Sequence, residues 1–124
     1  MVKKICLDTD ILIEILHNDG ITREDLAGYG EEFYTTSVSI FEVWYGKHEE
    51  GLETLLDNLY KISFDEKSAK MAAEMLKKLK QKGLLIEPRD MFIAASCITN
   101  DMLLLTHNKK HFERLKQFGL KLIE

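Results

Sequence analysis

The chain has 124 residues, of which 45% are apolar and 31% are charged, and its formal net charge is −4 at pH 7. This composition is that of a globule that buries its own core, and the acidic balance argues against a general nucleic-acid coat protein. No apolar run approaches the roughly 18 residues of a membrane span, so we expect one cytoplasmic domain, residues 1–124, without membrane association.

The first half of the chain is predicted to alternate short strands and helices. An apolar run predicts a strand over 2–8, and Asp10 is expected to cap the following helix, which Asn18-Asp19-Gly20 ends. The pattern then predicts a helix over 22–27, a strand over 33–36, helices over 37–45 and 51–58, and a strand over 59–64.

The second half continues this alternation. Asp65 is expected to cap a long helix that stops before Gly83, and Pro88 suits the first turn of a helix over 88–100. A strand over 102–105, a helix over 108–117 and a strand over 120–123 complete the chain. Strands that alternate with helices predict a parallel sheet covered on both faces, whose ligands bind beyond the carboxyl ends of the strands. Both cysteines, Cys6 and Cys97, lie in apolar stretches and are expected to be buried and reduced.

Three acidic residues stand where elements begin or end. Asp8 closes the first strand, Glu42 lies near the start of the helix over 37–45, and Asp90 lies in the first turn of the helix over 88–100. In a parallel sheet such ends meet at one edge, so these carboxylates are expected to converge. Converging carboxylates repel and are tolerated mainly when a cation binds between them, which predicts a site for a hard divalent metal ion.

Each of these acids also has a structural explanation. Asp8 could start a helix, although Asp10 supplies that cap equally well. Ser39 and Glu42 match the S-x-x-E spacing of a capping box, and Asp90 complements a helix dipole. The three together, at compatible ends, favour function.

The segment Thr106-His107-Asn108 follows the fourth strand and is expected at the same edge. Asn108 could bond a metal-bound water or cap the last helix, and capping is favoured. His107 and His111 have a spacing that can hold zinc, but the glutamate of H-E-x-x-H is absent, which argues against a zinc site.

Four short motifs occur in one order along the whole chain. They are Leu7-Asp8-Thr9, Ser39-x-x-Glu42 with Gly46, Asp90-x-x-Ile93-Ala94-Ala95, and Thr106-x-Asn108-x-x-His111-Phe112-Glu113. With these motifs the chain resembles a PIN-domain ribonuclease of the VapC type, the toxin half of bacterial and archaeal toxin–antitoxin pairs.

The resemblance implies a three-layer α/β/α sandwich with a four- or five-stranded parallel sheet. It implies Mg²⁺ or Mn²⁺ bound by the catalytic acids Asp8, Glu42 and Asp90. It further implies endonucleolytic cleavage of RNA, often structured RNA such as tRNA, and a homodimer held inactive by a cognate antitoxin.

The chain departs from this family at one position. Many PIN nucleases carry a fourth acid where this sequence has Asn108, which puts a second metal in doubt. Asp10 could substitute, although a cap is its expected role, and Thr9 and Thr106 are further candidates for supporting the site.

Two surface features bear on substrates and partners. Lys109, Lys110 or Arg89 could hold an RNA backbone. The helix over 37–45 is apolar nearly all round, so it is either buried on both sides or packs on a second subunit or an antitoxin helix. Complete burial of Trp44 would remove it from such an interface.

Two other functions stay open at this point. Asp8-Thr9-Asp10 looks like the D-x-D opening of haloacid-dehalogenase phosphatases, in which the first aspartate is the nucleophile. That class expects a late pair of aspartates, which Thr106-His107-Asn108 does not supply. The other is a catalytically inactive PIN-fold module that binds protein or RNA, against which the three intact carboxylates argue.

Overall fold

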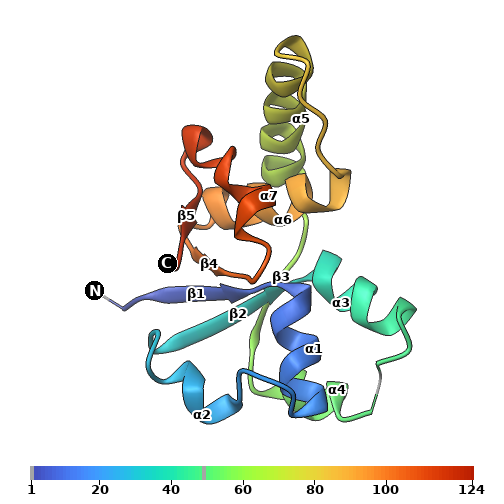
Figure 1. Ribbon diagram of the computed structural model, residues 1–124, viewed down its shortest axis with the longest axis vertical. Helices are drawn as coiled ribbons and strands as arrows, with labels where there is room; N and C mark the ends of the chain where they lie inside the picture. Colours follow the sequence, from blue (N-terminus) through green and yellow to red (C-terminus); the bar gives the residue numbers. More distant parts are fainter. Residues whose placement is uncertain (1, 49) are drawn as a thin grey trace.

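The computed structural model describes residues 2–48 and 50–124, and its centre is one sheet of five parallel strands in the order β3-β2-β1-β4-β5 (Figure 1). The strands are β1 (Lys4–Leu7), β2 (Glu32–Thr36), β3 (Tyr60–Ile62), β4 (Leu103–Leu105) and β5 (Lys121–Leu122). Because β1 is central, its carboxyl end lies between those of β2 and β4.

Helices cover both faces of the sheet. They are α1 (Thr9–His17), α2 (Arg23–Leu26), α3 (Ser37–Tyr45), α4 (Leu52–Asp57), α5 (Glu66–Gln81), α6 (Pro88–Thr99) and α7 (Lys109–Glu113), followed by the 3-10 turn η1 (Lys116–Phe118). Figure 1 shows α1 to α4 on one side of the sheet and α5 to α7 on the other. The predicted α/β/α sandwich with a parallel sheet is therefore confirmed.

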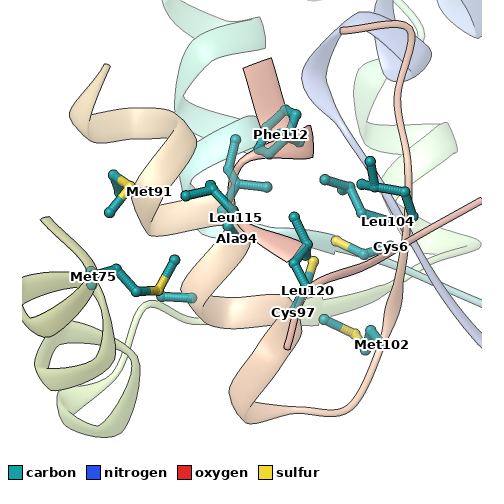
Figure 2. Packing of buried hydrophobic residues seen from close by; sticks show 14 of the residues in the cluster. Cys6, Met75, Met91, Ala94, Cys97, Met102, Leu104, Phe112, Leu115 and Leu120 are labelled. Carbon is teal, nitrogen blue, oxygen red and sulfur yellow. The ribbon is translucent and has the colours of Figure 1, made fainter. Parts of the chain in front are cut away.

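The alternation of side chains along β1 separates two hydrophobic cores. Ile5 and Leu7 pack with the helices α1 to α4, whereas Cys6 points to the opposite core under α5 to α7. Figure 2 shows Cys6 in this second core, with Cys97 among the surrounding side chains. Both cysteines are free and buried, as predicted, and the hydrogen bond that the Cys97 thiol makes to Cys6, together with burial, raises the pKa of Cys97.

The start of α1 corrects one prediction. Asp8, not Asp10, is the N-cap, because its extended backbone ends β1 and its Oδ1 accepts a 2.8 Å hydrogen bond from the Thr9 amide. The Asp8 amide still bonds to the β4 carbonyl of Leu105, so one residue closes the strand pairing and opens the helix. Asp10 therefore lies inside the first turn of α1.

The start of α3 corrects a second prediction. Thr36 is the N-cap, and its hydroxyl oxygen accepts a 3.1 Å hydrogen bond from the Ser39 amide. Ser39 and Glu42 both lie within the helix, so the capping-box interpretation of Glu42 was wrong. Glu42 belongs to the second turn, and its carboxylate takes no part in capping α3.

The last predicted helix, over 108–117, is broken in two. The Gln117 side-chain amide donates to the Arg114 carbonyl at 2.7 Å, which satisfies a main-chain acceptor just past the end of α7. Asn108 stands at the N-cap position of α7 but makes no side-chain cap bond, so its expected capping role is wrong.

Across residues 2–48 and 50–124, no helix combines the length and apolarity needed to span a bilayer.

Candidate active site

The three predicted acids are brought together at the carboxyl edge of the sheet. Asp8 follows β1, Glu42 lies on α3 and Asp90 lies in the first turn of α6. The Thr9 hydroxyl donates to Glu42 Oε1 at 2.7 Å and thereby joins the start of α1 to α3. Asp90 is near enough to Asp8 for its charge to raise the pKa of Asp8, and the charge of Glu42 likewise raises the pKa of Asp90.

Asp8 is the most deeply buried of these acids, with 6% of its surface exposed. Burial, followed by the neighbouring charge of Asp10, raises its pKa from 3.8 to about 7. Its Oδ2 accepts a 2.7 Å hydrogen bond from the buried Thr106 hydroxyl at the end of β4, which opposes the rise. A bound cation would stabilise the charged form of this carboxyl.

Asp90 occupies the other flank of the site. Burial raises its pKa, the nearby His111 opposes this, and the charges of Glu42 and Glu87 add to it. His111 Nδ1 lies 3.7 Å from Asp90 Oδ2 and 2.9 Å from the side-chain nitrogen Nδ2 of Asn108. The Asn108 side chain therefore faces His111.

Arg89 is a partner of Glu42 that the sequence did not indicate. Its Nη1 lies 3.3 Å from Glu42 Oε2, and its Nε lies 3.3 Å from Glu87 Oε1. The Arg89 side chain is 47% exposed, so this pair is reached by solvent. The guanidinium partly neutralises an acid that would otherwise face two other carboxylates.

The loop after β4 is anchored to α1 by Asp10 and Glu14. The His107 amide donates to Asp10 Oδ2 at 3.0 Å, and the His107 ring contacts Glu14. His107 and His111 thus serve different acids, in agreement with the argument against a zinc pair. Glu14 was not singled out from the sequence, although its position one turn after Asp10 places both on one face of α1.

The donors at this edge fit a hard divalent cation. All the acids offer oxygen, the ligand type of Mg²⁺ and Mn²⁺. Asp10 Oδ1 is buried without a hydrogen-bond partner among the described residues, which leaves an unused anionic donor atom at the site. Within residues 2–48 and 50–124, no three acidic, histidine or cysteine side chains lie close enough together to hold a metal ion in their present positions. Thr9, Thr106 and Arg89 instead hold the carboxylates at the edge.

A small hollow of about 120 Å³ opens beside Asp90. Its lining is formed by Leu85, Ile86, Glu87, Asp90, His111 and Arg114. The Arg114 guanidinium donates to the Leu85 carbonyl at 3.0 Å and closes one side. The acids therefore adjoin a partly apolar recess rather than a flat surface.

A parallel sheet with an acidic carboxyl edge is the architecture of the PIN domain, and the PIN-domain family model matches residues 5–117 of this chain. Ribonuclease VapC1 from Methanocaldococcus jannaschii is 33% identical to it over 121 residues, which cover 98% of this chain and 88% of the relative. Ribonuclease VapC3 from the same organism is 34% identical over 89 residues, covering 72% of this chain and 93% of the relative. The chain belongs to the PIN-domain family, among the VapC ribonucleases.

Solved structures agree with this assignment. The chain resembles a chain in the crystal structure of VapBC2 from Rickettsia felis bound to a promoter DNA fragment, with a TM-score of 0.83, 25% identity and 97% of each chain covered. It also shares its fold with DNA-bound VapBC from Salmonella typhimurium, with a TM-score of 0.85, 23% identity, and 99% and 98% of the two chains covered. The resemblance seen in the sequence motifs is confirmed, and the phosphatase alternative is set aside.

Proposed function

We propose that this chain is a single-domain, divalent-metal-dependent endoribonuclease, the toxin of a type II toxin–antitoxin pair, with Asp8, Glu42 and Asp90 as its catalytic metal ligands. The observation that carries the proposal is the buried Asp8 carboxyl, whose pKa of about 7 reflects burial and the crowding of acids at one sheet edge. Membership of the VapC ribonucleases supports the activity. The oxygen donors favour Mg²⁺ or Mn²⁺ as the cofactor.

A divalent cation bound by these acids would supply a hydroxide nucleophile from water near neutral pH and offset charge on the scissile phosphate. In-line attack of water on phosphorus would break the bond to the 3′ oxygen and leave a 3′-hydroxyl and a 5′-phosphate. Catalysis of this kind depends on positioning, which is where the protein's own side chains act.

The side chains around the acids fix their orientation. Thr106 holds one oxygen of Asp8 and Thr9 holds one oxygen of Glu42, each at 2.7 Å. Arg89 holds the second oxygen of Glu42 and stays half exposed. If Glu42 bound a cation, Arg89 would lose this partner and would lie beside the site, where its guanidinium could hold a phosphate of the RNA backbone.

The partners we propose are an antitoxin protein and a second copy of this chain. Among the structural relatives are toxin–antitoxin complexes by name. On α3, Phe41, Trp44 and Tyr45 are 56%, 41% and 77% exposed, so Trp44 is not removed from an interface. Exposed aromatic side chains on one helix are typical of protein contacts. We propose the cytoplasm as the location, because an RNA substrate and a protein antitoxin would both be met there.

An RNA cleavage assay tests the function directly. Purified protein is incubated with a tRNA pool and Mg²⁺ or Mn²⁺, in parallel with EDTA and with the Asp8→Asn variant. We expect cleavage that EDTA abolishes and the variant lacks. RNA binding without cleavage would favour the inactive binding module, and a phospho-aspartate trapped at Asp8 would restore the phosphatase.

A further inference from the structure

Asp10 carries an oxygen that the fold leaves without a partner. Its Oδ2 accepts from the His107 amide at 3.0 Å and lies 3.5 Å from the Thr106 hydroxyl. Its Oδ1 is buried and has no hydrogen-bond partner among the described residues. Burying an anionic oxygen without a hydrogen-bond donor destabilises the fold, and a bound cation would remove that cost.

This oxygen belongs to a carboxylate that is paired with Asp8. The Thr106 hydroxyl lies between the two, 2.7 Å from Asp8 Oδ2 and 3.5 Å from Asp10 Oδ2. The charge of Asp10 is the largest electrostatic contribution to the raised pKa of Asp8. Two carboxylates that share one hydroxyl repel each other unless a cation joins them.

Asn108, the residue at the position where many PIN nucleases carry a fourth acid, is engaged elsewhere. Its side-chain nitrogen lies 2.9 Å from His111 Nδ1, and its backbone amide donates to Thr106 Oγ1 at 2.9 Å. The carboxamide is also neutral, so it adds no charge for a metal ion. Asp10, which lies across Thr106 from Asp8, does carry a negative charge.

We propose that Asp10 is the fourth acidic ligand of the metal centre, with Oδ1 as its donor atom, in place of residue 108. This inference rests on the proposed function, because it assumes a metal ion at Asp8. The bond from the His107 amide holds Oδ2, which fixes the direction of Oδ1. Asp10, in the first turn of α1, then supplies the carboxylate that the chain lacks at residue 108.

Mn²⁺ titration of the full chain by calorimetry, without RNA, tests the assignment. Asp10→Asn keeps the side-chain shape and an acceptor for the His107 amide but removes the charge. We expect it to weaken Mn²⁺ binding by about tenfold or more. Asp101→Asn is a matched control, because Asp101 is 77% exposed by side chain, pairs with Lys121, and has a left-handed φ of 52° that asparagine tolerates. It should bind Mn²⁺ as the wild type does.

Comparing the variants separates failure of this inference from failure of the proposed function. If Asp8→Asn loses Mn²⁺ binding while Asp10→Asn binds like the wild type, Asp10 is not a ligand and the proposed function stands. If both variants bind Mn²⁺ like the wild type, the metal site itself is refuted. Weakening in Asp10→Ala but not in Asp10→Asn would mean that Asp10 only holds the loop at His107, which also overturns the inference. Loss of binding in Asn108→Ala alone would return the fourth ligand to residue 108.

Discussion

Replacing Asp8 with asparagine should stabilise the metal-free protein above neutral pH and flatten its dependence on pH. In the folded chain the pKa of Asp8 is about 7, against 3.8 for the unperturbed group. Between these values the folded protein keeps a proton that the unfolded chain has released. Stability therefore falls as pH rises through this window, and the full cost is present above pH 7.

The size of the effect follows from the shift. One pKa unit corresponds to about 1.4 kcal/mol, so a rise from 3.8 to about 7 costs about 4 kcal/mol at high pH. Asparagine caps a helix as well as aspartate does, so the bond to the Thr9 amide is kept. Loss of the charged acceptor for the Thr106 hydroxyl removes part of the gain, about 1 to 2 kcal/mol.

The remaining gain of about 2 to 3 kcal/mol should raise the melting temperature of a domain this size by roughly 8 to 12 °C. Thermal unfolding in EDTA, at several pH values between about 5 and 8, measures it for the wild type and Asp8→Asn. The difference between the two profiles isolates Asp8 from the histidines, which titrate in both proteins. Asp101→Asn serves as the control for loss of an exposed acid. Parallel profiles for the wild type and Asp8→Asn would refute the burial argument.

Three further variants test the surroundings of the site. Thr106→Val should destabilise the protein by about 2 kcal/mol, and more at pH 8 than at pH 5, because it removes the donor that lowers the pKa of Asp8; urea unfolding measures this, and equal losses at both pH values would contradict it. Arg89→Ala should strengthen Mn²⁺ binding up to about fivefold, because it removes the cation that pairs with Glu42, while it weakens RNA binding; weaker metal binding in calorimetry would contradict the release of Arg89. Trp44→Arg should convert a homodimer to a monomer in light scattering after size exclusion, and an unchanged mass would remove α3 from the dimer interface.

The fold was largely predictable because it follows from local patterns. Apolar runs bounded by turn residues marked the strands, and their alternation with helices implied parallel pairing. The prediction failed where long-range contacts decide the outcome. At the break between α7 and η1 the Gln117 side chain bonds to the Arg114 carbonyl, a contact that no periodicity of apolar residues reveals.

The candidate site was predictable in its positions but not in its contacts. The location of Asp8 and Asp90 follows from the rule that strand ends and helix starts share one edge. The structural alternative for Glu42, a capping box with Ser39, is wrong because Thr36 caps α3. The hydrogen bond from Thr106 to Asp8 joins residues 98 apart in sequence, and the pairing of Arg89 with Glu42 is equally non-local. Such contacts carry no local signal.

The corrected caps strengthen the case that these acids serve a cation. The cap at Asp8 needs only an acceptor oxygen, which asparagine supplies at no electrostatic cost. Glu42 caps nothing, and among the described residues its charge is balanced by the exposed Arg89. A first-turn acid such as Asp90 gains less than about 1 kcal/mol from a helix dipole when exposed, yet here burial raises its pKa. Neutral side chains would satisfy every structural requirement found at these three positions with less repulsion. The negative charge that remains is what a divalent metal ion requires.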